Sequence, residues 1–279
     1  MESRSSLLLS DKPVNKGFDS GKGFNCGLDI RLRGDSLAFD FCEGVFGPPA
    51  EMRKLDDIRA SLLDPNCTGP DPVYGIAMDV GIEGDAEELH KRFLLFGVVA
   101  YASGRLGEEP VRSQGHVHGV APHCGWSTPE VFEIWEGRAI IYAQESVGDD
   151  PGRCVAVEAG PGDQVVVPPN WAHFVANASS TDRMIFGALC ERQYSFVYEG
   201  VRAHGGLAWF PVFCDGRVEW KANPRYRTSD LRVCGPRLYS ELGLDPAIAL
   251  YKQFQADPEH VQWVSEPARV AAIWPTFEP

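Results

Sequence analysis

The sequence predicts an all-β domain built from many short strands. Between residues 72 and 190, apolar runs of strand length follow one another, about 8–12 residues apart, and turn residues separate them. The chain of 279 residues contains 29 glycines and 21 prolines, which suits a fold with many turns. Helical periodicity is confined to short stretches at the two flanks. These observations favour a β-sandwich or a β-barrel.

The segment before these strands has two parts. Residues 1–48 are rich in Gly, Asp and Lys with weak periodicity, and they predict an arm that packs on the core or on a second subunit. One short strand is expected within it, at residues 36–41. Residues 49–64 predict a helix because their apolar residues recur at helical spacing. These residues are Met52, Leu55, Ile58 and Leu62.

The strand region follows as a series of apolar runs. We expect strands at 73–80, 93–102, around Gly115–His118, and at 131–135, 139–144, 154–158, 164–167, 174–177 and 184–189. Residues 194–233 add aromatic, strand-like pieces at 206–214 and 218–220.

The C-terminal tail differs from the strand region. Asp245-Pro246 is a favourable N-cap and N1 pair, and Asp257-Pro258 should end the helix that it begins. Ile248, Tyr251 and Phe254 would line one face of that helix. The predicted organisation is an arm (1–48), a barrel domain (49–235) and a partly helical extension (236–279) that packs on the barrel without a chemical role.

Charge and cysteine usage exclude several classes of protein. The net charge of −13 argues against a nucleic-acid partner, because phosphate contacts need a basic face. No apolar run approaches a membrane span, and the N-terminus lacks the features of a signal peptide. The eight cysteines are scattered without a CxxC pair, so they predict neither a zinc ribbon nor a disulfide framework. A reducing cytoplasm is the expected location.

Three histidines and a carboxylate are the candidate metal ligands. His116 and His118 are two apart, so an extended strand directs both to one face. Glu130 and Glu133 lie in the next apolar run, on opposite faces of a strand, and compete for the carboxylate role. His173 follows a double-proline turn at the start of a later strand.

Other potential ligands have weaker contexts. His123 and Cys124 lie between His118 and Glu130 and could reach the site, although a solvent loop is the default interpretation. His90, His204 and His260 belong to no metal-binding motif in the sequence, and we interpret them as structural or surface residues.

Three imidazoles and one carboxylate suit Fe(II), Mn(II), Co(II), Ni(II) or Zn(II), and an octahedral ion would keep two positions open. Those positions suit a vicinal diol or hydroxyketone, or dioxygen with one substrate atom.

The order of these residues resembles the two cupin motifs, and one branch most closely: the cupin-type phosphoglucose isomerases. The similarity covers about residues 49–225. The motifs that carry it are Arg53-x-Leu55-x-Asp57, the run from Ser103-Gly104 through Arg112-Ser113-Gln114-Gly115-His116-Val117-His118, Pro129-Glu130-Val131-Phe132, and Val167-Pro168-Pro169-Asn170-Trp171-Ala172-His173 with Asn177.

The resemblance implies a cupin jelly-roll barrel and assigns the site. His116, His118, Glu130 and His173 would bind one divalent metal ion, with Fe(II) favoured and Mn, Ni, Co or Zn as alternatives. Glu130 and His173 would be the catalytic residues. The phosphate of the substrate would contact Tyr74, Ser113, Gly115 and Tyr198.

The sequence also departs from the family pattern. Phe132 and Cys190 stand where the family has tyrosines, so two hydroxyl groups near the sugar are lost. Ser113 replaces a threonine, and about five residues are inserted between His118 and Glu130. Lost polar contacts alter which hydroxyl pattern a site recognises.

The expected function is metal-dependent aldose–ketose isomerisation of a sugar phosphate, similar to the interconversion of glucose 6-phosphate and fructose 6-phosphate. An Fe(II) oxygenase and a non-catalytic cupin that binds a sugar or sugar phosphate are the alternatives. The expected partners are a small anionic substrate and a second copy of the chain, in a homodimer, with no nucleic acid and no membrane.

Overall fold

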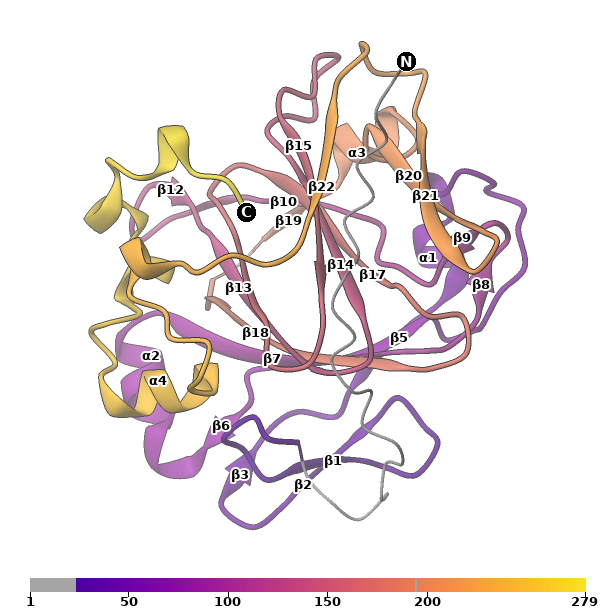
Figure 1. Cartoon of the computed structure of the whole chain (residues 1–279). Helices are drawn as coiled ribbons and strands as arrows, with labels where there is room; N and C mark the ends of the chain where they lie inside the picture. The colour runs from indigo at the N-terminus through magenta and orange to yellow at the C-terminus, as the bar shows by residue number, and fades with distance from the viewer. Residues whose placement is uncertain (1–23, 194) are drawn as a thin grey trace.

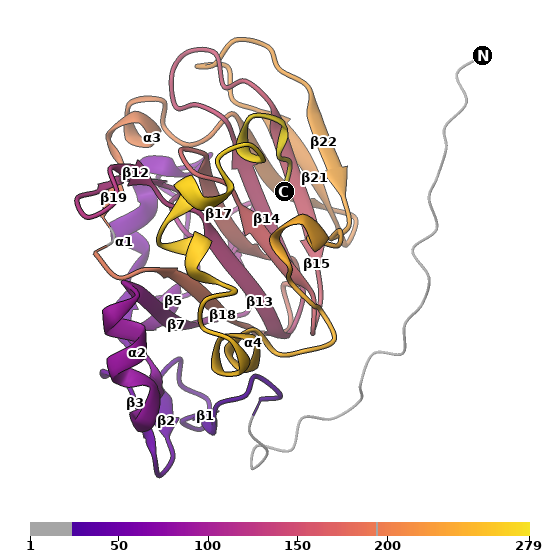
Figure 2. The ribbon, with the colours of Figure 1, turned by 90° about the vertical axis from the view of Figure 1, so that its left-hand side faces the viewer.

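Two mainly antiparallel sheets that face each other form the centre of the computed structural model, which describes residues 24–193 and 195–279 (Figure 1). The larger sheet has the strand order β16-β13-β18-β7-β5-β4, and the smaller one has the order β17-β14-β15-β22. Figure 2 shows the sheets from the side, with the C-terminal segment against the outer surface. The predicted all-β, jelly-roll architecture is thus confirmed.

The bounds of the strands in the two sheets are as follows. The larger sheet contains β4 (Glu51–Arg53), β5 (Tyr74–Met78), β7 (Leu94–Tyr101), β13 (Glu130–Glu136), β16 (Gln164–Val167) and β18 (Met184–Glu191). The smaller sheet contains β14 (Ala139–Gln144), β15 (Cys154–Ala159), β17 (Ala172–Asn177) and β22 (Leu231–Cys234). Strand β22 runs parallel to β15, and the other pairs are antiparallel.

Short elements surround the sheets. The paired short strands are β1 (Ile30–Leu32) with β2 (Phe39–Phe41), β3 (Val45–Phe46) with β6 (Gly81–Ile82), β8 (Arg105–Leu106) with β9 (Glu109–Pro110), β10 (Val117–His118) with β19 (Phe196–Val197), β11 (Val120–Ala121) with β12 (Trp126–Ser127), and β20 (Trp209–Cys214) with β21 (Arg217–Ala222). The α-helices are α1 (Leu55–Ile58), α2 (Ala86–Lys91), α3 (Glu199–Ala203) and α4 (Leu250–Ala256).

The strands β7 and β18 of the larger sheet are buried on both faces, which explains why they do not alternate between apolar and polar residues. On β7, Val99 and Tyr101 point into the core between the sheets. Phe96, Val98 and Ala100 point the other way, into a second core. That second core is closed by residues of the N-terminal arm and of the C-terminal segment, among them Phe24, Ile30, Leu250, Tyr251 and Phe254.

The predicted helix over residues 49–64 is wrong in extent. Residues Glu51–Arg53 form an edge strand, in which Arg53 pairs with Tyr74 of β5. Helix α1 has one turn, and a 3₁₀ turn at Arg59–Ser61 follows it. The apolar residues Leu55, Ile58 and Leu62 are nevertheless buried, because a short helical turn satisfies their spacing.

The predicted start of the C-terminal helix is also wrong. Helix α4 begins at Leu250 with Ala249 as its N-cap, whereas Asp245 accepts a hydrogen bond from the Ala247 N–H in a turn. The helix ends before Asp257-Pro258, as expected.

Strands 139–144 and 164–167 agree with the prediction residue for residue, and the helices α2 and α3 had no predicted counterpart. Within the described residues, no helix has the length and apolar character needed to cross a membrane.

Candidate metal centre

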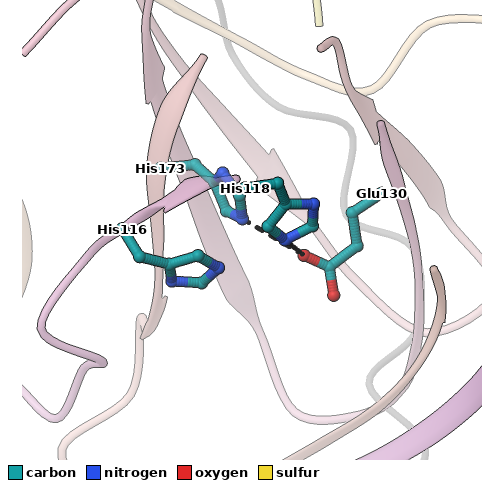
Figure 3. A group of neighbouring side chains, drawn as sticks. All are labelled: His116, His118, Glu130 and His173. Atoms are coloured by element: carbon teal, nitrogen blue, oxygen red, sulfur yellow. Dashed lines mark hydrogen bonds and ion pairs between the residues drawn. The ribbon is translucent and has the colours of Figure 1, made fainter. Parts of the chain in front are cut away.

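Four side chains predicted as ligands converge at one point between the sheets. One potential ligand atom each from His116, His118, Glu130 and His173 lies within 4.8 Å of all the others (Figure 3). The two closely spaced histidines come from the segment around β10, Glu130 from the start of β13, and His173 from β17. Residues far apart in the sequence therefore contribute to one site.

The backbone fixes the position of His116 opposite His173. The His116 N–H donates to the His173 carbonyl at 3.0 Å, and the His173 N–H donates back to the His116 carbonyl at 2.9 Å. This reciprocal exchange is the hydrogen-bonded pair of an antiparallel ladder. It holds the two imidazoles side by side, with their ring centroids 4.4 Å apart.

Backbone carbonyls select the tautomers of His118 and His173. His118 Nδ1 lies 3.0 Å from the Thr128 carbonyl, and His173 Nδ1 lies 3.2 Å from the Trp171 carbonyl. Because a carbonyl only accepts hydrogen bonds, each Nδ1 carries the proton and each neutral ring has its lone pair at Nε2. An Nδ1–H donated to a carbonyl is the usual arrangement around metal-binding histidines.

These lone pairs face a carboxylate oxygen. Glu130 Oε2 is 3.2 Å from His118 Nε2 and 3.1 Å from His173 Nε2. Three acceptor atoms in contact repel one another unless a proton or a cation lies among them. The buried Nε2 atoms of His116 and His118 also lack a hydrogen-bond partner among the described residues. The site therefore fits a divalent cation.

The electrostatics of the site keep the ligands in the form that binds metal. Burial alone would raise the pKa of Glu130, but its contacts with His118 and His173 hold that pKa well below its usual value. Burial, reinforced by the neighbouring imidazoles, lowers the pKa of His116 well below its usual value. At neutral pH the carboxylate is therefore ionised and His116 is neutral, as ligation requires.

Glu133 lies on the opposite face of β13, as strand alternation predicts, yet it is not exposed to solvent. Its carboxylate accepts hydrogen bonds from the Leu250 N–H at 2.8 Å and from Trp135 Nε1 at 2.8 Å. Burial raises the pKa of Glu133. This residue anchors the C-terminal segment, and the structure does not bring it to the metal centre.

The metal centre opens into a cavity of about 470 Å³. His116, Glu130 and His173 line this cavity, and so do all the residues predicted to contact phosphate: Tyr74, Ser113, Gly115 and Tyr198. Ser113 Oγ accepts a hydrogen bond from the Val175 N–H at 3.2 Å, and its hydroxyl also interacts with that of Tyr101, which lines the cavity too. Gly115 has a φ of 89°, a conformation that glycine adopts without strain.

Two arginines of the cavity have no assigned role in the sequence prediction. Arg53 and Arg202 both line the cavity beside Tyr198. The sequence signal that could have identified Arg53 is its place in the Arg53-x-Leu55-x-Asp57 motif. In the structure Arg53 lies in β4, directly opposite Tyr74 in the ladder. Arg202 follows Tyr198 by one helical turn in α3, so the two share a face.

Apolar side chains form the cavity wall near the metal centre. Phe132, Phe186, Ala188 and Phe196 line it, and the Phe132 ring lies 6.0 Å from that of His173. Cys190 is buried on the same strand as Phe186 and Ala188, at alternate positions, and burial raises its pKa well above its usual value.

The other candidate ligand, His123, lies outside the group of four. Its ring stacks on Phe93 with a centroid distance of 4.1 Å, and its Nε2 is 3.0 Å from the Ser265 carbonyl. Its Nδ1 is 3.4 Å from the buried carboxylate of Glu191. His123 therefore connects the loop before Glu130 to the C-terminal segment.

Comparisons with solved structures give only distant similarity. An oxalate oxidase structure has 13% identity and a TM-score of 0.34, covering 45% of this chain and 54% of the other. The oxalate decarboxylase of Bacillus subtilis has 16% identity and a TM-score of 0.33, covering 47% of this chain and 28% of the other.

Sequence comparisons are more informative. The chain is 26% identical over 192 residues to the glucose-6-phosphate isomerase of Thermococcus litoralis and 28% identical over 199 residues to that of Pyrococcus abyssi, covering 68% of this chain and 95% of each relative. A Rhizobium meliloti protein named "Putative glucose-6-phosphate isomerase 1" is 30% identical over 141 residues, covering 49% of this chain and only 60% of its own length.

The family model of glucose-6-phosphate isomerase (GPI) matches residues 53–228, well over half of the chain. That range includes both histidine segments, Glu130 and every lining residue of the cavity. The chain therefore belongs to the cupin-type glucose-6-phosphate isomerase family.

Proposed function

We propose that this protein is a metal-dependent aldose–ketose isomerase of a sugar phosphate, which interconverts glucose 6-phosphate and fructose 6-phosphate. The observation that carries the proposal is the group His116, His118, Glu130 and His173. Three of its members, His116, Glu130 and His173, line a cavity that Tyr74, Ser113 and Tyr198 also line. Family membership and the names of the relatives support the same reaction.

The ligand set fits one divalent ion, and we propose Fe(II). Such an ion would supply Lewis acidity to the carbonyl and hydroxyl oxygens on the two reacting carbons of the sugar. The three histidines and Glu130 would hold it, with the Nδ1–H bonds of His118 and His173 fixing their orientation.

Isomerisation moves one hydrogen between two adjacent carbons. Glu130 is ionised and lies at the cavity wall, so it is placed to take a proton from one carbon and return it to the neighbouring carbon. Its contacts with His118 and His173 weaken it as a base. A direct hydride shift between the carbons would leave Glu130 and His173 with the task of positioning the substrate oxygens.

The first experiment measures metal-dependent turnover. Protein stripped with a chelator and reloaded anaerobically with Fe(II) should convert fructose 6-phosphate to glucose 6-phosphate, read through a coupled glucose-6-phosphate dehydrogenase. The stripped protein should be inactive. Metal binding without turnover would contradict the proposal and favour an oxygenase, tested by oxygen uptake, or a sugar-binding protein, tested by calorimetry.

The His173→Ala variant tests the ligand assignment. Loss of this imidazole should reduce metal affinity by more than about tenfold. Removal of a residue that only hydrogen-bonds to a metal ligand already reduces metal affinity by about that factor. Isomerase activity should disappear while the variant stays folded. The control is His90→Ala, which removes an exposed histidine on α2 and should leave the metal content unchanged. Equal metal content in both variants would refute the assignment.

We also propose a cytoplasmic homodimer. The scattered thiols, none of them in a disulfide among the described residues, are compatible with a reducing compartment. Light scattering should give about twice the chain mass of 30.7 kDa. A mass equal to one chain would contradict the dimer.

A further inference from the structure

Two arginines, Arg53 and Arg202, line the cavity of the metal centre, and the charges of both act on Tyr198. The Tyr198 ring is 6.1 Å from the His116 ring, and the Arg202 guanidinium lies 5.0 Å from the Tyr198 ring. Arg53 is also close, because the positive charges of both arginines oppose the rise that burial causes in the pKa of Tyr198. Both cations therefore lie within reach of one ligand group.

Both arginines keep guanidinium N–H groups that no acceptor among the described residues satisfies. Arg53 Nε is buried without a hydrogen-bond partner among the described residues. The ion pair of Arg53, at 3.0 Å through Nη2, is with Glu51, whose side chain is 69% exposed. Arg202 donates from Nε to Gln114 Oε1 at 3.1 Å and has no ion pair with a carboxylate in the described part of the chain. Several N–H donors thus remain for a ligand.

The acidic residues that line the cavity are already paired. Asp56 accepts from Arg59 Nε at 2.5 Å, Asp57 accepts from the Lys54 N–H at 2.8 Å, and Glu130 contacts two imidazoles. Arg53 and Arg202 add two positive charges to the lining of this cavity, although the chain as a whole carries a net charge of −13. A buried donor without a partner is costly, which favours a site that an anion completes.

Neutral donors line the same cavity. Burial raises the pKa of Tyr74 to about 12 despite the neighbouring Arg53, so its hydroxyl keeps its proton and can donate it. Ser113, whose oxygen accepts from Val175, forms a hydroxyl pair with Tyr101, and both residues line the cavity. Guanidinium groups surrounded by hydroxyls match the several oxygens of a phosphate monoester, which arginine binds through paired hydrogen bonds.

We propose that Arg53 and Arg202 form a cationic clamp around Tyr198 that binds the phosphate of the substrate and thereby sets its distance from the metal centre. This inference rests on the proposed function for the identity of the substrate. Arg53, half-buried and with an Nε that has no partner among the described residues, provides the stronger contact, and the exposed Arg202 provides the second cation.

Calorimetry with inorganic phosphate on metal-free protein tests the clamp without relying on turnover. The Arg53→Gln variant should bind phosphate about tenfold more weakly than the unmodified protein, as expected for a lost charge-assisted hydrogen bond. The Arg202→Ala variant should bind it a few-fold more weakly, and Arg202→Lys should recover part of the loss. The Arg217→Ala control removes an equal charge from an exposed strand residue outside the cavity and should not change binding.

Steady-state kinetics with fructose 6-phosphate add a second measurement. Both cavity variants should raise KM for the phosphorylated sugar by factors similar to their loss of phosphate affinity. Unchanged phosphate binding in the Arg53 and Arg202 variants, or no phosphate binding by the unmodified protein, would overturn the clamp. If phosphate binding depends on both arginines but no isomerisation occurs, the clamp stands and the proposed reaction fails. If Arg53→Gln does not fold, as judged by circular dichroism, the Arg202 variants still decide.

Discussion

At the scale of single residues, strand alternation accounts for most of the predicted site. His116 and His118, two apart, do reach one point, and Glu130 and Glu133, three apart, do face opposite sides of β13. The sequence could not reveal what covers Glu133, because its partner Leu250 belongs to a segment that lies 117 residues further along the chain. The pairing of Arg53 with Tyr74 was hidden for the same reason.

The two glutamates provide a matched test of the metal centre. Glu130→Gln removes a ligand charge, so we expect a fall in metal affinity of at least about tenfold and loss of activity. Glu133→Gln makes the same chemical change three residues later, on the other face of the strand, and should keep full metal content. Competitive chelator titration measures both affinities.

The Glu130→Gln and Glu133→Gln variants also separate an effect on metal binding from an effect on the free energy of unfolding. Glu133→Gln should lower the free energy of unfolding by about 1–3 kcal/mol, because a side-chain amide cannot accept all the hydrogen bonds that the carboxylate accepts from Leu250 and Trp135. Metal loss in the Glu133 variant together with metal retention in the Glu130 variant would reverse the assignment.

At the scale of secondary structure, the long apolar runs were predictable and the short elements were not. Strands 139–144 and 164–167 are buried throughout, and each run ends at turn residues that the sequence displays. The prediction of one helix over residues 49–64 was wrong because four apolar residues at helical spacing also suit an edge strand followed by a single helical turn. Pairing with β5 decides between the two, and pairing is a tertiary property.

Helix α4 gives a prediction at this scale, because its residues differ sharply in burial. Phe254 is 2% exposed in the outer core, whereas Ile248, predicted to share its helix face, lies before the helix and is 44% exposed. Phe254→Ala should cost about 3–5 kcal/mol of unfolding free energy. Ile248→Ala should cost well under about 1 kcal/mol. Urea denaturation of the two variants checks the difference, and equal costs would contradict the packing described for this segment.

At the scale of the whole molecule, the larger sheet separates two cores with different tasks. The inner core, between the sheets, surrounds the cavity and the metal centre. The outer core attaches the N-terminal arm and the C-terminal segment to the back of the same strands. Strands β7 and β18 contribute to both cores, and they are buried over their whole length. The outer core therefore supports the strands that position the site.

This arrangement predicts that the C-terminal segment is needed for folding although it contributes no ligand to the metal centre. A chain that ends at residue 244 loses Leu250, Tyr251, Phe254 and Trp263, all buried against the larger sheet. Each large apolar side chain removed from a core costs about 2–5 kcal/mol, against a total stability of about 5–15 kcal/mol. The truncated chain should lack a cooperative thermal transition and bind a hydrophobic dye, with Leu238→Ser, at a position 68% exposed, as the stable full-length control. A truncated chain that melts cooperatively and retains metal would show instead that the inner core is sufficient.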